Sequence, residues 1–424
     1  MAMKERQKMK RAVYHLWTFT ISKFISNFGA QIFAFAVSFY ILQVTGSASS
    51  FAINLLCNVL PRIAAGPFAG LAADRFSRKK IIILSHLITG VTILGLILLH
   101  IYSSEVSIPI LYAATAIFSL ASSFSGIAFT SSITSLVDHE QIQRAMSLNQ
   151  MVISMAAVAS PAAGGILYGF LSLHLIFMIY FAAIIIALIL EATMDFTLYG
   201  KPRTENIQES MWVNMKKGFV YVKGSTILVT IISIAFVVNF FMGAFQVGYS
   251  YILIDQLKMP AEHFGIAESA LAIGMLVIAI YMSMAKEFKY PLVISKYGIL
   301  FLGLIIGVYS LPLIISFSYW LVFAYFSVLM FLIGASTTFI NTPIQVMMQR
   351  DIDDEYKGRV FSIVETGAQA LVPAGTLLFG VLYDLFPAPW IMTSSACLLM
   401  ASVLFLARST VIQKVYPEKF EQIS

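Results

Sequence analysis

The feature that most constrains this chain is the recurrence of long apolar segments from one end to the other. A helix of about 20 apolar residues spans the hydrocarbon core of a bilayer, and the segments are at least about that long. Hydrophobic residues make up 59% of the sequence and charged residues 11%, whereas an average soluble domain is about 25% charged. The sequence therefore predicts a polytopic protein whose surroundings are the lipid bilayer.

The hydrophobic pattern predicts twelve membrane-spanning helices and hence an all-α fold. Several segments exceed the length that a perpendicular span requires, so some helices are expected to tilt or protrude. The predicted spans are residues 15–43, 49–73, 80–101, 108–136, 145–169, 172–195, 225–252, 264–285, 291–316, 318–348, 359–383 and 388–408.

The basic residues predict the orientation of these spans. Nearly all of the 27 lysines and arginines fall at the two ends of the chain or in alternate loops, whereas Lys258 lies in a loop of the other set. Because positive loops stay in the cytoplasm, both termini are expected there, in a cell membrane. The net charge of +6 is thus a topology signal, and no nucleic-acid partner is expected. The first apolar segment is too long for a cleavable signal peptide.

The polar loop 196–224 divides the predicted helices into two groups of six. The expected organisation is an N-terminal bundle (1–195), a cytoplasmic loop (196–224) and a C-terminal bundle with a short tail (225–424). The pattern Arg-x-x-Ser followed by Gly-x-Leu-Tyr starts at Arg144 and recurs from Arg359, ending at Tyr168 and Tyr383. This weak echo predicts two pseudo-symmetric halves, a design typical of transporters. Chance similarity between two apolar helices is the alternative.

A short charged turn, residues 66–80, joins the second and third predicted spans. It resembles the loop signature Gly-x-x-x-Asp-Arg-x-Gly-Arg-Arg/Lys of the major facilitator superfamily, with Ser77 in place of the second glycine. The matching residues are Gly70, Asp74, Arg75, Arg78 and Lys79. The resemblance implies a twelve-helix fold of two pseudo-symmetric six-helix bundles, and a gating role for this loop, with Asp74 as a conformational latch.

A second resemblance lies in the fifth predicted span. Residues 160–168 resemble the antiporter motif Gly-Pro-x-x-Gly-Gly, with Pro161, Gly164 and Gly165 matching and Ser160 replacing the first glycine. Residues 45–48, 215–221 and 358–362 also resemble the drug and macrolide efflux branch of the superfamily. This resemblance implies a drug:proton antiporter that works by alternating access.

Polar residues inside the predicted spans are candidates for the lining of a substrate cavity. Lys23, Asn27 and Gln31 are spaced by four and share one helix face. The resemblance places the first span on the central cavity, and for Lys23 this functional reading is favoured over the alternative, hydrogen bonding between helices. That structural reading is favoured for Asn54 and Asn58. The other lining candidates are Asn149, Gln150, Asn239, Gln246, Asn341 and Gln345.

Proton antiport, which the resemblance implies, requires a carboxylate whose proton affinity changes as the site becomes wet or dry. The candidates are Glu365 in the eleventh predicted span and Glu268 in the eighth. A structural role for Glu365 opposite Arg62 is the alternative. Glu191, Asp195 and Asp384 lie near helix ends and are expected to reach headgroup water.

The sequence therefore predicts a secondary exporter of bulky amphipathic small molecules, of the macrolide or multidrug type, coupled to protons. The alternatives are an exporter of an endogenous siderophore, peptide or lipid, and a non-transporting sensor or scaffold. An enzyme is not expected, because the six histidines are scattered. Cys57 and Cys397 fall inside spans and are read as packing residues, so no metal or other cofactor is expected. A monomer is expected by analogy with the family.

Overall fold

The computed structural model describes most of the chain as helices and short turns. The described residues are 2–103, 106–138, 141–196, 198–199, 219–285, 288–353, 356, 360–361, 363–364, 367 and 370–416; the side chains of residues 2–10, Pro67, Asp74 and Thr134 lie outside the description. Two compact units are present. Unit 1 comprises Met1–Thr45, Ile53–Thr204 and Pro260–Ser269, and unit 2 comprises Gly46–Ala52, Glu205–Met259 and Ala270–Ser424.

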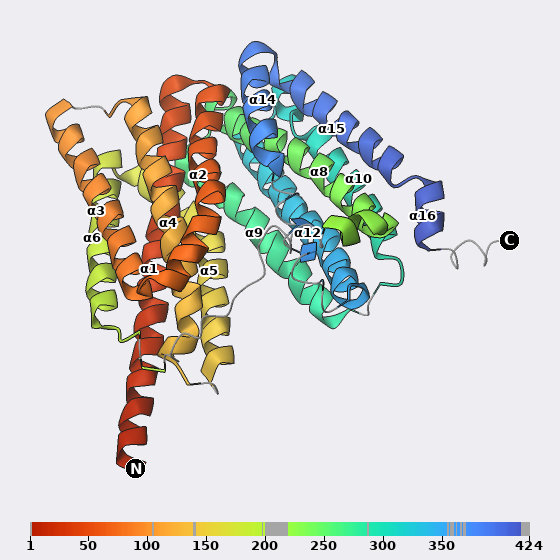
Figure 1. Ribbon diagram of the computed structural model, residues 1–424. Helices are drawn as coiled ribbons and strands as arrows, with labels where there is room; N and C mark the ends of the chain where they lie inside the picture. The colour runs from red at the N-terminus through yellow and green to blue at the C-terminus, as the bar shows by residue number, and fades with distance from the viewer. Residues whose placement is uncertain are drawn as a thin grey trace. The chain divides into compact units, whose positions relative to one another are not determined.

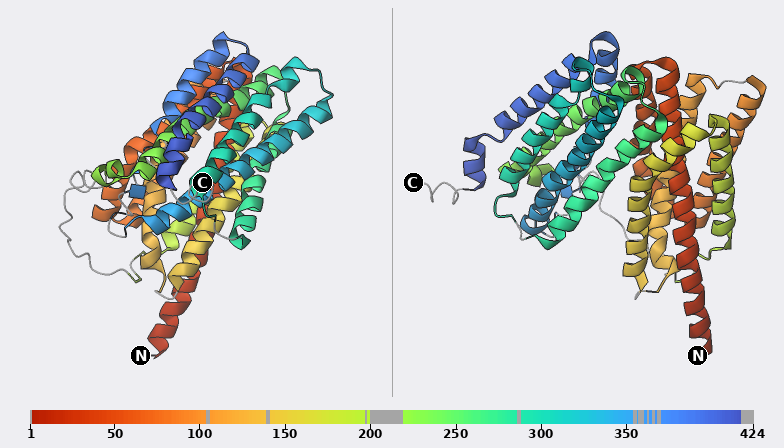
Figure 2. Two further views of the ribbon diagram at one scale, coloured as in Figure 1. Left: turned by 90° about the vertical axis from the view of Figure 1, so that its right-hand side faces the viewer. Right: turned by 180° about the vertical axis from the view of Figure 1, so that it is seen from behind.

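Unit 1 is a bundle of long helices (Figure 1). It contains α1 (Ala2–Thr45), α3 (Arg78–Ser103), α4 (Ile108–Leu136), α5 (Ile142–Phe170) and α6 (Leu173–Thr193), together with most of α2 (Ala48–Arg75) and the start of α9 (Ala261–Met284). The first turns of α1 extend beyond the neighbouring helices of this unit (Figure 2).

Unit 2 contains the first turn of α2 and the rest of α9. Its own helices are α8 (Thr226–Ser250), the π-helical turn η2 (Tyr251–Gln256), α10 (Pro291–Val308), α11 (Leu311–Ile314), α12 (Tyr319–Asp351), α14 (Val372–Leu385), α15 (Ala388–Leu406) and α16 (Ser409–Val415). The domain boundary expected in the loop 196–224 stays a prediction, because residues 200–218 lie outside the described chain.

The helices follow the apolar segments closely. Within the described residues, eleven helices are long and apolar enough to cross a membrane, and α4 has the bounds that the sequence predicts. The eleventh predicted span corresponds to the shorter apolar helix α14, which is preceded by residues that are only partly described. Local signals set several starts: the Ser172 and Ser225 hydroxyls accept hydrogen bonds from the third amide of α6 and of α8.

The span predicted over residues 291–316 is confirmed as one apolar segment, Pro291–Ile314, but the helix within it is interrupted. The helix stops at Val308, and a turn at Tyr309 and Ser310 leads into the short α11. Pro312 explains the break, because its ring removes the amide hydrogen that the Val308 carbonyl would have accepted. The Tyr325 hydroxyl donates to that carbonyl instead, at 2.5 Å. A side chain of α12 thus satisfies the carbonyl that the proline frees.

Each unit has its own aromatic core. In unit 1, Phe33 lies 4.8 Å from Phe118 between ring centroids, and 5.4 Å from both Phe177 and Tyr180. In unit 2, Tyr309 lies 4.7 Å from Phe326 and 5.3 Å from Phe245. Tyr309, Phe326 and Phe177 are fully buried. Large apolar side chains that remain accessible are numerous, as expected for helices that face lipid.

Two glycines that match in the sequence echo make matching contacts. In unit 1 a Cβ added to Gly165 would lie 2.3 Å from the Ala261 carbonyl oxygen, at the start of α9. In unit 2 a Cβ added to Gly380 would lie 2.6 Å from the Ala52 Cβ and 3.3 Å from the Ala48 carbonyl oxygen, at the start of α2. Both close approaches require glycine. The echo is therefore accompanied by a shared way of packing helices.

Asp384 supplies the cap of α2 in unit 2. Its carboxylate accepts hydrogen bonds from the Ala48 and Ser49 amides, at 2.6 and 3.0 Å, and from the hydroxyls of Ser47 and Ser49. Asp384 is exposed, as expected for a residue at a helix end. The positive end of the α2 dipole stabilises the carboxylate at this position.

Asp384→Ala is expected to lower the free energy of unfolding by about 1 kcal/mol, because the α2 amides lose their acceptor. Asp384→Asn, which keeps one oxygen acceptor, is the matched control and is expected to lose less. Thermal unfolding of the purified protein in detergent measures both changes. Equal stability of the wild type and Asp384→Ala would contradict this role for the carboxylate.

Candidate functional site

The turn between α2 and α3 is very short. α2 ends at Arg75 and α3 begins at Arg78, so Phe76 and Ser77 alone separate the two helices. The Ser77 carbonyl accepts a hydrogen bond from the Ile81 amide, at 3.1 Å, which places Ser77 at the N-cap of α3. Serine is favoured at that position, which accounts locally for the departure from the glycine of the family signature.

Two basic residues of this turn cap other helices of unit 1. Arg78 donates to the Ser131 carbonyl at 2.7 Å and to the Ser135 hydroxyl at 3.2 Å, in the last turns of α4. Lys79 donates to the carbonyls of Ala192 and Met194, at 2.7 and 2.9 Å, at the end of α6. Cations at helix C-termini satisfy unpaired carbonyls and complement the helix dipole. The turn therefore holds the ends of three helices together.

The same end of the bundle includes the chain that follows α6. The Tyr199 amide donates to the Ser135 carbonyl at 2.9 Å. Burial, and then the nearby Asp138 carboxylate, raise the pKa of the Tyr199 phenol above its ordinary value. The phenol therefore stays neutral at physiological pH, and Arg78 and Lys79 remain the cations that hold this end.

Lys79→Ala is expected to destabilise the protein by about 1 kcal/mol, because two carbonyls at the end of α6 lose their donor. Lys80→Ala is the matched control, since Lys80 is exposed on the same turn. The thermal unfolding midpoints of the two variants, measured side by side, check the difference. Equal midpoints would show that the contacts of Lys79 contribute nothing to stability.

The remaining residues of the loop signature are described less fully. Arg75 is exposed at the end of α2, and a Cβ added to Gly70 would meet no described atom within 4 Å. The side chain of Asp74 and the whole of Glu365 lie outside the described residues. Their expected roles, as latch and as proton carrier, stay predictions.

The antiporter-type segment of α5 is a tightly packed contact within unit 1. Gly164 faces α1, where an added Cβ would lie 3.0 Å from the Phe35 ring. Gly165 of α5 and Gly265 of α9 face each other. A Cβ added to either glycine would lie 3.1 Å from the Cα of the other. Pro161 lies one turn before these glycines, and its carbonyl oxygen would be 2.2 Å from a Cβ at position 265. The motif thus lets two backbones touch directly.

Glu268 lies just beyond this glycine contact. It is half-buried, in the part of α9 that belongs to unit 1. The next residue, Ser269, accepts a hydrogen bond from the Ala162 amide at 3.0 Å. The structure therefore places one proton-coupling candidate beside the antiporter-type segment, while its function remains a prediction.

Lys23 is buried within unit 1 and is 8% exposed. Its ammonium group donates to the Asn149 side-chain oxygen, which joins α1 to α5 across 126 positions of sequence. It also lies 5.9 Å from the ring centroids of both Phe19 and Phe129. Two lining candidates are thus partners of each other in a dry environment lined by aromatic rings.

The other lining candidates do not form one group in the structure. Asn27, Gln31 and Asn239 are half-buried, and Asn239 donates to the Ala235 carbonyl of its own helix at 2.9 Å. The exposed candidates are Gln150, Gln246, Asn341 and Gln345. Their lining role stays a prediction.

The structural reading favoured for Asn54 is confirmed. Its side chain donates to the Ser38 hydroxyl at 2.9 Å and accepts from the Thr115 hydroxyl at 3.0 Å, and so joins α2 to α1 and α4. Asn58 accepts a hydrogen bond from Arg62 at 2.5 Å, one turn along the same helix. Asn54 thus holds three helices of unit 1 together, whereas the bond between Asn58 and Arg62 lies within α2.

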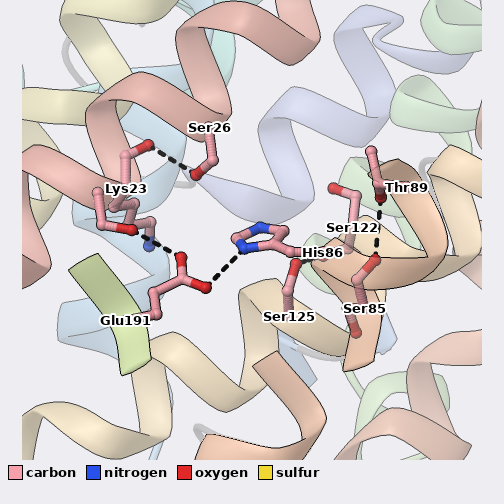
Figure 3. A network of polar contacts seen from close by, with 9 residues as sticks. Lys23, Ser26, Ser85, His86, Thr89, Ser122, Ser125 and Glu191 are labelled. Atoms are coloured by element: carbon pink, nitrogen blue, oxygen red, sulfur yellow. Dashed lines mark hydrogen bonds and ion pairs between the residues drawn. The ribbon is translucent and has the colours of Figure 1, made fainter. Parts of the chain in front are cut away.

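A buried polar cluster of Ser22, His86 and Glu191 is not expected from the sequence. Glu191 of α6 accepts a hydrogen bond from the Ser22 hydroxyl of α1 at 2.6 Å. Its second oxygen lies 2.7 Å from Nδ1 of His86 on α3, as Figure 3 shows. Glu191 and Ser22 are 0% exposed and His86 is 6% exposed. The prediction that Glu191 reaches headgroup water is therefore wrong. Three residues further on, Met194 is buried and its carbonyl accepts from Lys79.

These three residues do not form a nucleophilic triad. In a triad the histidine lies between the nucleophile and the acid, so that it can take the proton of the hydroxyl. Here Glu191 lies between Ser22 and His86, and the serine donates its proton to the carboxylate. The arrangement stabilises a buried charge and does not activate a hydroxyl.

Comparison with known proteins identifies the class. The family profile described as Major Facilitator Superfamily matches residues 19–376, and the chain belongs to that superfamily. It is accordingly a multi-pass membrane protein and a secondary transporter, not an enzyme. The family predicted from the loop of residues 66–80 is confirmed.

Individual relatives are distant but extend over nearly the whole chain. The uncharacterized MFS-type transporter YfiS of Bacillus subtilis is 28% identical over 403 residues, which cover 92% of this chain and 91% of the relative. Macrolide efflux protein A of Streptococcus pyogenes is 24% identical over 382 residues, covering 90% and 92% of the two chains.

A solved structure supports the fold. A bacterial homologue of the iron transporter ferroportin, in an inward-facing state, matches with a TM-score of 0.71 at 16% identity, covering 93% of this chain and 99% of the other. At that identity the match is evidence for the fold alone. The predicted all-helical major facilitator architecture is confirmed.

Proposed function

We propose that this protein is a secondary active exporter of bulky, amphipathic small molecules of the macrolide or multidrug type. It exchanges them for protons by alternating access, with both termini in the cytoplasm. The observation that carries the proposal is the antiporter-type segment of α5, where Gly165 and Gly265 bring two helix backbones into contact. The similarity to macrolide efflux protein A over 90% of the chain supports the substrate class.

The contact at Gly165 suits an antiporter for a physical reason. An exporter dissipates its driving gradient if protons or substrate leak between its helices. Backbone-to-backbone packing leaves no flexible side chain between α5 and α9 and so favours a tight seal. Glu268, three residues beyond Gly265, and Glu365 are the coupling carboxylates proposed for this function.

The experiment is the accumulation of labelled erythromycin in a drug-hypersensitive bacterium that expresses the protein, with and without a protonophore. Lower accumulation than in cells carrying the empty vector, abolished by the protonophore, is the expected result. Asp74→Asn, checked for normal membrane levels, is the inactive control. Unchanged accumulation at normal protein levels would exclude macrolides as substrates.

The coupling candidates are tested in the same assay. Glu365→Gln and Glu268→Gln are compared, and the variant that folds yet loses protonophore-sensitive export identifies the carboxylate. Export that stays proton-coupled in both folded variants would remove both residues from this role.

An exporter of an endogenous anionic product, such as a carboxylate siderophore, is the second candidate. The observation that favours it is the buried Lys23, because an ammonium group in a dry environment attracts anions and repels cations. If transport of labelled erythromycin is absent, competition by carboxylate compounds in binding experiments with the wild type and Lys23→Met distinguishes this candidate.

A further inference from the structure

The Ser22–His86–Glu191 cluster holds at least one exchangeable proton. The His86 Nδ1 and a Glu191 oxygen are 2.7 Å apart. At that distance one of the two atoms must carry a hydrogen, since two lone pairs would repel each other. The other oxygen of Glu191 accepts from Ser22 at 2.6 Å. Two donors directed at one carboxyl group are best satisfied by an ionised Glu191 and a protonated Nδ1.

The geometry also defines how a further proton enters. Glu191 and Ser22 have no exposed surface, whereas His86 retains 6%. Exchange with water therefore passes through the imidazole. A proton that binds Nε2 converts the neutral ring into an imidazolium and leaves the contact of Nδ1 with Glu191 in place. The imidazolium and the Glu191 carboxylate then form a buried ion pair without net charge.

His86 has a counter-ion in direct contact and cations farther away. Glu191 on α6 faces the ring, Lys23 on α1 follows Ser22, and Lys79 on α3 binds the Ala192 carbonyl next to Glu191. Among the described residues, α1 also carries the buried His15, and α6 carries the buried Tyr180. α4 presents the Phe129 ring, 6.1 Å from the imidazole, and α5 presents Asn149 to Lys23. The Glu191 carboxylate, 2.7 Å from Nδ1, supplies the counter-charge that a second proton on the ring needs inside unit 1.

The cluster is linked to the turn between α2 and α3. His86 lies seven residues after Lys79, about two turns along α3. Lys79 binds the carbonyl of Ala192, the residue next to Glu191. α3 and α6 are therefore joined by two contacts, Lys79 with the Ala192 carbonyl and His86 with Glu191. The second contact changes its charge when His86 takes up a proton. A movement of α3 against α6 at that contact would also move the turn between α2 and α3.

We propose that Ser22, His86 and Glu191 form a proton-binding site inside unit 1, with His86 as the group that exchanges protons and Glu191 as its buried counter-ion. The role of this site in driving export, through the contact of α3 with α6, rests on the proposed proton-coupled function. Proton binding by the site does not depend on that function, and it is tested without substrate.

The test is a pH titration of the protein labelled with ¹⁵N-histidine, in lipid nanodiscs, by nuclear magnetic resonance. The signal that disappears in His86→Gln belongs to His86. In the wild type the signal is expected to change reversibly between the neutral and the charged form as the pH is varied. In Glu191→Gln that change is expected to differ, because the counter-ion is lost. A His86 signal in the wild type that does not respond to pH overturns the proposal.

His100→Gln is the matched control, since His100 lies on the same helix and stacks on His174, with ring centroids 5.2 Å apart, and not on a carboxylate. The His86 transition is expected to be unchanged in this variant. If Glu191→Gln does not fold, the titration of the wild type against His86→Gln decides the question alone.

The coupling role is tested separately, by labelled erythromycin export into a proton gradient in vesicles. Loss of gradient-driven export in His86→Gln, with His100→Gln active, supports it. Gradient-driven export in the wild type that persists unchanged in His86→Gln overturns it. Export by the wild type that ignores the gradient overturns the proposed antiport together with this role, and leaves the titration of His86 as a separate result.

Discussion

Gly165→Ala is expected to abolish export and to destabilise the protein by about 2 kcal/mol or more, because the added methyl group has nowhere to go. Its Cβ would lie 2.3 Å from the Ala261 carbonyl oxygen and 3.1 Å from the Gly265 Cα. Both neighbours are backbone atoms of α9, so a change of rotamer cannot relieve the clash. The helices must separate, and the packing of unit 1 around the antiporter-type segment must change.

Gly126→Ala is the matched control for this variant. Gly126 also lies within a long helix of unit 1, but a Cβ there would meet no described atom within 4 Å. Gly126→Ala is expected to be neutral or slightly stabilising, because alanine favours helix more than glycine does. Gly265→Ala tests the contact from the other side, and its effect combined with Gly165→Ala is expected to be less than additive. Thermal unfolding and erythromycin accumulation measure these effects; an active, stable Gly165→Ala protein would contradict the packing described here.

Glu191→Leu is expected to lower the free energy of unfolding by about 3 kcal/mol, since it leaves a buried imidazole N–H and a buried hydroxyl without their acceptor. The double variant His86→Leu/Glu191→Leu is expected to recover a large part of that loss. It removes the unpaired imidazole, and Ser22 can donate to a carbonyl of its own helix. Double-mutant analysis of chemical or thermal unfolding gives the coupling energy. If the destabilisation of the double variant equals the sum of the destabilisations caused by His86→Leu and Glu191→Leu alone, the two side chains are not coupled.

The fold was largely predictable because it depends on local signals. A run of apolar residues identifies a span wherever it occurs, and α4 was predicted with its observed bounds. Hydropathy alone locates the span 291–316 but not the turn inside it, although Pro312 signals the break after Val308. The sequence could have located that turn, because proline acts on the carbonyl four residues before it.

The site was less predictable because its contacts are long-range. The position of Glu191 near a helix end suggests contact with headgroup water. Its actual environment is set by Ser22, 169 positions away, and by His86, 105 positions away. The sequence does not predict the contact between Lys23 and Asn149 for the same reason, although it identifies each residue separately as a lining candidate. Helical spacing identifies which residues share one face of a helix. It does not identify the neighbouring helix that packs against that face. A rare acidic residue and a histidine inside apolar spans were the available signals.

The division of α2 and α9 between the two units has a consequence for how the protein is made. Unit 1 includes Pro260–Ser269, which residues 205–259 separate from the rest of that unit in the sequence. Unit 2 includes Gly46–Ala52, from the beginning of the chain. While the ribosome is still translating the first six helices, Gly165 has no Gly265 to pack against. The N-terminal half must therefore wait in the membrane in an incomplete form until α9 emerges from the translocon. A gene split in the loop 196–224 would express two fragments that each lack a piece of their own core, and these fragments are expected to accumulate only when they are produced together.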